Sequence, residues 1–274
     1  SVSYGLISYY TAYFKANYPE EYMVCLLNAY VDNSEKLAGS IAECRRLGIP
    51  VLPPDVNSSY AEFTVESQAD GPAAVRFGLA AIKNVGAGAV APIIEARLRD
   101  GPFESIERMC RAADMSGVNR KTLESLTKAG ALDTFGMRGG VLTLLDRVLS
   151  LAQSEARLRG SDQASMFDLF GESVPTPLSH ITIPEIETPS GERVAWEMEL
   201  LGVDLSVTSQ LQAVALGGSS DAIVSRNQIT DDMAGQKIVL LGQVESATHR
   251  LTREQKPYTI ASLALLDGGI DVFI

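Results

Sequence analysis

The sequence predicts a multidomain, mainly α-helical chain that ends in a β-rich segment patterned like the start of a small barrel. Its 274 residues are enough for about two domains of ordinary size. Apolar residues recur at helical spacing through most of the chain, between turns rich in Gly and Pro. From Lys237 to Ile274 the pattern changes to the alternation that is typical of strands.

The composition indicates a globular protein with an acidic balance. Hydrophobic residues make up 46% of the chain, charged residues make up 21%, and the net charge is −11. This charge argues against a protein that holds nucleic acid over its whole surface, although it leaves room for a local site. Residues 72–136 contain nine Lys and Arg against seven Asp and Glu, so this segment carries +2 and the rest of the chain −13.

The cysteines and the hydropathy predict a cytoplasmic protein with no membrane span. Cys25, Cys44 and Cys110 are scattered and lack CxxC spacing, which favours free thiols in a cytosol. His180 and His249 are far apart, so no metal-binding cluster is indicated. No apolar run reaches about 18 residues, and no signal peptide is found. Both ends fall inside patterned elements, so we expect a piece of a longer protein.

The N-terminal part predicts three helices and two strands. The helices are "YGLISYYTAYFKANY", ended by Pro19, then "EEYMVCLLNAYV" and "SEKLAGSIAECRRLG". The third opens at Asp32, with Glu35 three residues later as in a capping box, and ends at Gly48. Beyond a Pro-rich connector, "AEFTVE" and "AVRFGLA" alternate like two strands around a turn at "SQADGP".

Two similar helix–turn–helix units follow and form a degenerate internal repeat. The first is "IKNVGAGAVAPIIEAR", in which Gly86 and Gly88 lie between two helix-like runs. The second is "MSGVNRKTLESLTKAGALDTFG", with Gly117 at the turn, Asn119 as N-cap and Gly130 closing the helix. One further helix, "VLTLLDRVLSLAQSEARLRG", leads to the linker "SDQASMFDLFGESVPTPLSH", and a last helix, "PSGERVAWEMELLGVDLS", ends near Gly202.

The two turns are candidate phosphate-binding sites of the helix–hairpin–helix kind. Gly86 and Gly88 permit positive φ and leave no side chain in the way, and the following helix start presents N–H groups and a positive dipole end. Lys83 and Arg97 could add charge, and Arg120 is unfavourable to its own helix dipole unless it serves an anion. The alternative is a plain corner with glycines for packing. The candidate residues are Lys83, Val85, Gly86, Ala87, Gly88, Ala89, Asn119, Arg120 and Lys121.

The linker carries "QASMF", from Gln163 to Phe167. A Gln followed by an aliphatic–aromatic pair is a short anchor peptide, in which the amide hydrogen-bonds and the apolar pair fills a pocket on a partner. Alternatively, Met166 and Phe167 fold back onto the core of this chain. The candidate partner-binding residues are Gln163, Ser165, Met166 and Phe167.

The C-terminal strands place Arg250, Arg253 and Lys256 around their first turn. An oligonucleotide-binding (OB) barrel carries a binding loop at this place, so the three cations are a candidate single-strand-binding loop. The alternative is a solvated charged turn without a ligand.

Taken together and in order, these stretches resemble the alpha subunit of bacterial DNA polymerase III, the replicative C-family polymerase. "YGLISYYTAYFKANYPEEYMVCLLN" and "IAECRRLGIPVLPPDVNSS" resemble its fingers region, and "RFGLAAIKNVGAGAVAPIIEAR" and "VNRKTLESLTKAGALDTFG" its tandem helix–hairpin–helix. "QASMF" is similar to its internal sliding-clamp motif, and "WEMELLGVDLS" to the helix before its OB domain. The domains implied are the end of the fingers (1–71), the tandem hairpins (72–136), a helix, clamp-binding linker and connecting helix (137–235), and an incomplete OB barrel (236–274).

The resemblance implies a C-terminal part of a DNA-directed DNA polymerase, a nucleotidyltransferase. It implies non-sequence-specific binding of duplex DNA phosphates and attachment to the sliding clamp, the beta subunit. Single-stranded DNA and other holoenzyme subunits are further implied partners. The palm with its Mg²⁺-binding aspartates lies upstream in the family, so we expect neither catalysis nor a cofactor in this chain.

Two departures from the family pattern are present. Asn84 stands where the family often has glycine, and "LTREQKPYT" is less glycine-rich than its usual basic loop. Two alternatives stay open: an interaction module whose hairpins are only structural, and the sister error-prone polymerase of the same family.

Overall fold

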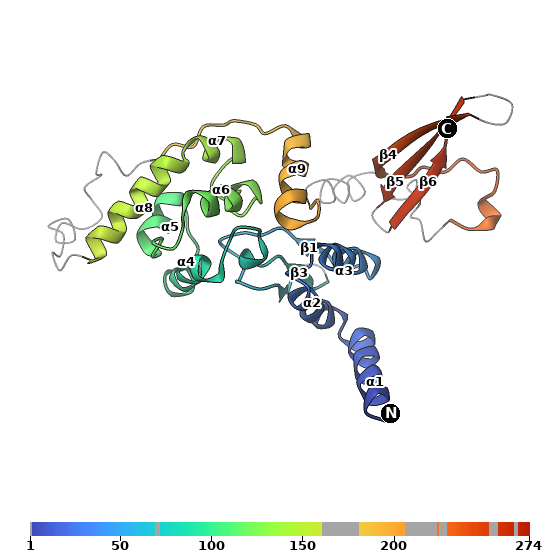
Figure 1. The fold of residues 1–274 in the computed structure, drawn as a ribbon, viewed down its shortest axis with the longest axis horizontal. Coiled ribbons are helices and arrows are strands. Elements are labelled where there is room, and N and C mark those ends of the chain that lie inside the picture. Colours follow the sequence, from blue (N-terminus) through green and yellow to red (C-terminus); the bar gives the residue numbers. More distant parts are fainter. Residues whose placement is uncertain are drawn as a thin grey trace.

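The computed structural model describes residues 2–68, 72–160, 181–205, 224, 229–251, 257–265 and 268–274. These residues form a mainly helical structure with two small sheets (Figure 1). The helices are α1 (Val2–Asn17), α2 (Pro19–Ala29), α3 (Ser34–Arg46), α4 (Ala87–Asp100), α5 (Ile106–Ala112), α6 (Arg120–Lys128), α7 (Arg138–Thr143), α8 (Leu145–Gly160) and α9 (Ser190–Leu201), with 3-10 turns η1 (Leu79–Ala81) and η5 (Asp231–Met233). The strands are β1 (Val51–Leu52), β2 (Thr64–Glu66), β3 (Ala74–Arg76), β4 (Gly242–Leu251), β5 (Pro257–Leu265) and β6 (Gly268–Phe273). Within the described ranges, no helix is long and apolar enough to cross a membrane.

The first three helices confirm the prediction for the N-terminal part, with one correction. Pro19 separates α1 from α2, as Pro commonly begins a helix. The N-cap of α3 is Asn33 and not Asp32, because the Asn33 side chain accepts a hydrogen bond from the N–H of Lys36. α2 and α3 bury apolar side chains, whereas α1 projects away from them with exposed rings such as Tyr4, which is 76% exposed (Figure 1).

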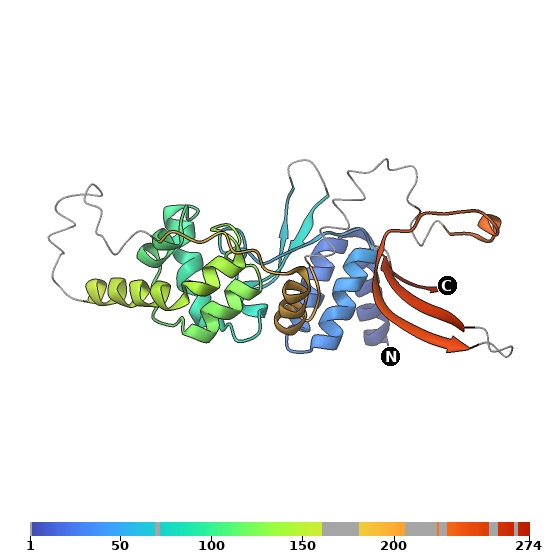
Figure 2. The same cartoon turned by 90° about the horizontal axis from the view of Figure 1, so that it is seen from above.

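The first sheet is a three-stranded one, and its order is β1–β3–β2. The predicted pair is antiparallel, with Val65 of β2 opposite Val75 of β3 (Figure 2). The third strand, β1, was not predicted; it pairs in parallel with β3 and is only two residues long. Phe63 and Phe77 pack beneath the sheet with ring centroids 4.5 Å apart, and both are buried.

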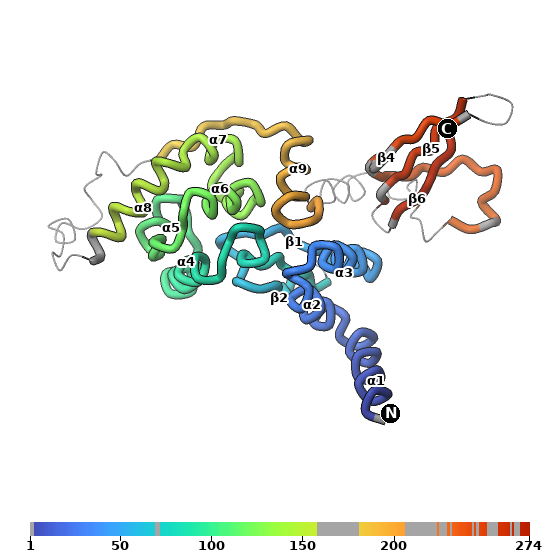
Figure 3. Tube along the Cα trace, in the orientation of Figure 1, coloured from blue at the N-terminus to red at the C-terminus, as the bar shows by residue number. Residues whose placement is uncertain are grey.

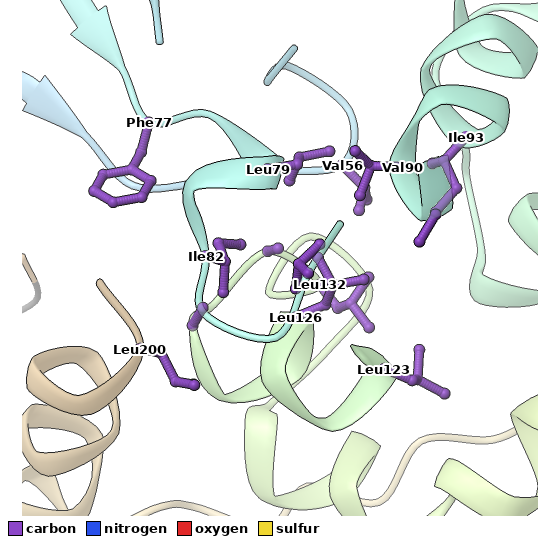
Figure 4. Packing of buried hydrophobic residues seen from close by; sticks show 14 of the residues in the cluster. Val56, Phe77, Leu79, Ile82, Val90, Ile93, Leu123, Leu126, Leu132 and Leu200 are labelled. Carbon is purple, nitrogen blue, oxygen red and sulfur yellow. The ribbon is translucent and has the colours of Figure 1, made fainter. Parts of the chain in front are cut away.

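The segment before the first glycine turn differs from the prediction. It is not a helix but the 3-10 turn η1, which follows β3 directly. Its Leu79 enters the core that lies beneath both hairpins (Figure 4). Ile82 belongs to the same core cluster as Leu126 of α6, so the first turn rests on the second unit. The rest of this region follows the predictions, because α6 begins after the N-cap Asn119 and is closed by a left-handed glycine.

The helix predicted after the second hairpin is divided into α7 and α8. The N–H of Leu144 returns to the carbonyl of Val141 and closes α7. Residues 181–189 cross α7 at very short range on their way to α9 (Figure 3). A Cβ at Gly140 would overlap the carbonyl oxygen of Pro184, so only glycine fits there. This close approach fixes the path of residues 181–189 over α7.

The C-terminal strands confirm the predicted β pattern and form an antiparallel sheet in the order β4–β5–β6. One face is apolar, since Ala261 lies opposite Val272 and Leu263 lies opposite Ile270. The described residues of this region do not form a closed barrel. The predicted domain limits remain predictions.

Arg97 of α4 is part of the fold, which corrects the expectation that it adds charge to the first hairpin. Its guanidinium Nη1 donates hydrogen bonds to the carbonyl oxygens of Val56 and Ser59, both at 2.7 Å. The side chain is buried and lies over the Tyr60 ring. Burial lowers the pKa of this guanidinium below its usual value. Arg97 therefore ties α4 to the loop before β2.

We expect Arg97→Met to lower the free energy of unfolding by about 2–3 kcal/mol, because it leaves two buried carbonyls without a donor. The matched control is Arg99→Met on the same helix, where the arginine is exposed and pairs with Asp100, and where the cost should stay within about 0.5 kcal/mol. Urea unfolding followed through the fluorescence of Trp196, the single tryptophan, measures both variants. Equal losses would contradict a structural role for Arg97.

Candidate nucleic-acid interface

The two hairpin turns have the same backbone hydrogen bond at the same place. In the first, the N–H of Val85 donates to the carbonyl of Ile82 at 3.0 Å. In the second, the N–H of Val118 donates to the carbonyl of Met115 at 2.9 Å. Each valine is buried and directly precedes the N-cap of its helix, Gly86 for α4 and Asn119 for α6. The two units thus present their helix starts in equivalent ways.

The positive φ of the first turn belongs to Asn84 and not to the glycines. Asn84 has φ 68°, whereas Gly86 is extended with φ −89° and ψ 150°. Asparagine tolerates the left-handed region better than most residues, which explains why it can stand where the family often has glycine. The expectation that positive φ explains Gly86 and Gly88 is therefore wrong, because Gly88 belongs to the right-handed helix α4.

The glycines of the first turn do not serve internal packing. A Cβ built on Gly86 or on Gly88 would meet nothing within 4 Å, and both residues are exposed. This contradicts the plain corner in which glycines let two elements approach each other. Because these two glycines are exposed and have no side chains, the backbone at this turn is accessible to a ligand.

The first turns of α4 and α6 carry backbone N–H groups for which the described structure provides no acceptor. Such groups exist at every helix start, and side chains, water or ligands satisfy them. Asn119 caps only the N–H of Thr122, at 2.9 Å, and Gly86 has no side chain to cap with. The N–H groups left open are those of Gly86, Ala87, Gly88, Asn119, Arg120 and Lys121.

The charges around these helix starts are positive. Lys83 and Lys121 are exposed, and neither has an ion-pair partner among the described residues. Arg120 pairs with Asp146 at the start of α8. α4 and α6 have no acidic residue in their first turns, as is also true of α1 and α7, whereas α2, α3, α5 and α9 each carry at least one. Both helix starts therefore keep their positive dipole ends uncompensated.

Each turn contacts the helix start of the other unit. The Thr122 hydroxyl donates to the Asn84 carbonyl at 3.1 Å, and the Asn84 amide donates to the Ser125 hydroxyl at 3.3 Å. In return, a Cβ at Gly117 would lie 3.5 Å from the Cα of Ala89. Asn84 and Gly117 occupy the same place, two residues before their N-caps, and Thr122 and Ala89 are both third in their helices. The contact has an approximate two-fold pattern.

Sequence reasoning missed Asn84, Thr122 and Ser125 as neighbours in this site. The one available signal was that Thr122 and Ser125 are polar residues on the buried side of α6, where each is 4% exposed. The first turn is held from the other side as well, because the N–H of Lys83 donates to the carbonyl of Leu200 in α9 at 3.0 Å.

The remaining sequence-predicted sites lie mostly outside the described residues. Arg250 lies near the end of β4, opposite Tyr258 of β5. The other two residues of the predicted single-strand-binding loop lie within residues 252–256, and the predicted partner-binding peptide lies within residues 161–180. The structure describes neither segment. Those residues are Arg253, Lys256, Gln163, Ser165, Met166 and Phe167.

Comparison with known proteins agrees with this geometry. A family model described as the helix-hairpin-helix motif matches residues 48–139. Proteins named DNA polymerase III subunit alpha are similar over the whole chain or nearly so: 38% identity over 280 residues in Escherichia coli (strain K12), 36% over 277 in Thermus aquaticus and 34% over 287 in Mycobacterium tuberculosis (strain ATCC 25618 / H37Rv). The alignments cover 99–100% of this chain and 22–23% of those proteins, so the chain spans less than a quarter of their length. With a matching helix-hairpin-helix motif and this identity along its length, the chain is homologous to the C-terminal part of DNA polymerase III alpha subunits.

Proposed function

We propose that this part of a polymerase alpha subunit binds duplex DNA through backbone phosphates, without reading base sequence. The observation that carries the proposal is the pair of equivalent helix starts, each with open N–H groups and a positive dipole end. Phosphate oxygens are the acceptors that such groups favour. The amide side chains of the two turns have internal partners, since Asn84 donates to Ser125 and Asn119 accepts from the N–H of Thr122. Arg120 is paired with Asp146, so these side chains are not set out to read base edges.

The bare surface at Gly86 and Gly88 supports close approach of a sugar–phosphate strand to the backbone. Lys83 and Lys121 add one exposed cation to each unit, and Lys121 is the second residue of its helix, within the first turn. A long-range field does not guide the binding, since the chain carries −11 overall. Short-range hydrogen bonds and two or three local cations are sufficient for non-specific binding that weakens as salt rises.

We also propose that Gln163 to Phe167 attaches the chain to the sliding clamp. Support comes from the sequence of the segment and from the elements on either side of it. Helix α8 ends at Gly160, and residues 181–189 are held against α7 by the glycine contacts described above. The 20 residues between them therefore begin and end on the body that carries the hairpins, so a partner bound to them is linked to that body.

A third proposal is that β4 to β6 begin an OB barrel that binds single-stranded DNA. The observation that favours it is an aromatic pair on the polar face of the sheet. Tyr258 and Phe273 are stacked with centroids 6.3 Å apart and planes 20° from parallel, and Phe273 is 70% exposed. Arg250 lies directly opposite Tyr258. An exposed ring that is stacked on a half-buried one beside a cation suits stacking with bases and contact with the strand backbone.

For the whole protein we propose DNA-directed DNA synthesis in the cytoplasm with other holoenzyme subunits as partners. The Mg²⁺-dependent chemistry belongs to a palm domain outside this chain, and no residue here is assigned to it. In this arrangement the hairpins hold the duplex and the clamp peptide keeps the enzyme on it.

The duplex proposal predicts at least about tenfold weaker binding for Gly88→Val with Lys121→Glu, because a branched side chain blocks one strand and a cation is reversed at the other. The slope of log affinity against log salt should become less steep by about 0.9 for each phosphate that is no longer neutralised. Fluorescence anisotropy with a labelled duplex over a salt series measures both. Gly191→Val with Lys36→Glu is the matched control, since Gly191 is also an exposed second residue of a helix and faces open space. A wild-type chain that does not bind duplex favours the interaction module with structural hairpins.

The clamp proposal predicts roughly micromolar affinity for a purified bacterial sliding clamp, as a short anchor peptide allows. Gln163→Ala with Phe167→Ala should abolish binding in calorimetry or surface plasmon resonance. The control, Gln153→Ala with Phe14→Ala, removes an exposed amide and an exposed ring elsewhere and should bind normally. Absence of binding by the wild-type chain would refute this proposal and leave the hairpin proposal intact.

The single-strand proposal predicts that Tyr258→Ala with Phe273→Ala weakens binding of oligo(dT) by about tenfold or more, since stacking contributes about 1–3 kcal/mol per base. Duplex affinity should not change. Tyr10→Ala with Phe14→Ala on α1 removes two exposed rings away from the sheet and serves as the control. Equal oligo(dT) affinity of all three proteins would exclude a stacking site on this face.

A further inference from the structure

We propose that Asn84, Thr122 and Ser125 are positioning residues that hold the two phosphate-binding helix starts at a fixed spacing, so that a duplex is bound by both hairpins as one unit. This inference rests on the proposed duplex binding and adds a device to it. None of the three residues needs to touch DNA. Their role is to set where α4 begins relative to α6.

The hydroxyl of Thr122 is free for this role because its helix does not need it. The N–H of Thr122 is already capped by Asn119, and the hydroxyl donates to the Asn84 carbonyl in the other hairpin. Thr127 on the same helix does the opposite, because its hydroxyl donates to Leu123 within α6. The two threonines are both nearly fully buried, so they differ in partner and not in surroundings.

Asn84 accepts a hydrogen bond from α6 and donates another to it, which fixes its peptide group and its side chain together. Its carbonyl accepts from Thr122, and its amide donates to Ser125 one helical turn later. Residue 84 lies two positions before the N-cap of α4, within a tight turn closed by Val85. A shift of α6 therefore moves the start of α4 with it, and the open N–H groups of both helices keep their separation.

Fixed separation matters because each site alone is weak. Two linked sites gain affinity only when their geometry lets both engage at once, and the gain falls when the connection becomes loose. Phosphate spacing on a duplex is regular, so a rigid pair of sites is matched to it in advance. A loosened pair would still bind one strand through either hairpin but would lose the joint contribution.

The experiment is a double-mutant cycle on duplex affinity with the whole chain: wild type, Thr122→Val, Gly88→Val and the double variant. Thr122→Val keeps the side-chain volume and removes the hydroxyl. We expect about fivefold weaker binding from it in the wild-type background, the factor that corresponds to one hydrogen bond. In the Gly88→Val background, where joint binding is already absent, we expect less than about twofold. Thr122→Ser should restore affinity, and Thr127→Val should leave it unchanged.

Equal losses of affinity in both backgrounds would overturn the inference, because they would show that Thr122 contributes only a local structural contact. No loss in the wild-type background would also overturn it, because the hydroxyl of Thr122 would then have no role in binding. If Thr122→Val does not fold by circular dichroism, Asn84→Gly replaces it, since glycine keeps the left-handed conformation and removes the bond to Ser125. The failure of the underlying function is recognised separately. In that case, wild type does not bind duplex, or Gly88→Val alone has no effect.

Discussion

The open N–H groups at the first turns of α4 and α6 are the constraint on which the rest of this region depends. A helix start cannot satisfy these donors by itself, and a protein normally covers them with a cap or an acidic side chain. Here Gly86 offers no cap, Asn119 covers one donor of its helix, and no acid lies in either first turn. The turns are nevertheless well ordered, because each is closed by a matching backbone hydrogen bond and each buries a valine. The local order thus supports donors that stay available to an external anion.

An acidic chain can still hold an acidic polymer because the relevant forces act over short distances. The segment of residues 72–136 carries +2, while the rest of the chain carries −13. At physiological salt, charges more than about 8 Å away are largely screened, whereas hydrogen bonds and dipole ends act at contact. In the proposed binding, the acidic balance elsewhere disfavours contacts with DNA away from the surface where donors and cations coincide. Neutralisation of phosphates by the local cations makes the proposed binding sensitive to salt.

The sequence predicts the features that depend on near neighbours and misses those that depend on distant ones. The N-cap Asn119 and the helix-closing Gly202 obey local rules, and the structure confirms them. The burial of Arg97 could not be predicted, because its partners lie about forty residues earlier in the chain. The close crossing of α7 by residues 181–189 requires glycine at residue 140, and its neighbour there, Pro184, lies more than forty residues later. The same holds for the candidate site: the helix–hairpin–helix motif could be predicted from the sequence, but the contact between Asn84 and Thr122 could not.

Helix α8 connects the proposed DNA contact with the proposed clamp contact. Its start pairs with the second hairpin through Asp146 and Arg120, and its end, Gly160, is followed by the linker that carries the proposed clamp peptide. A helix of 16 residues extends about 24 Å, so the linker begins well away from the hairpin turns. The return segment is held on α7, which keeps both ends of the linker on the same body as the hairpins. A clamp bound to this linker would therefore be tethered to the body that carries the proposed DNA-binding surface, and each contact would raise the effective concentration of the other.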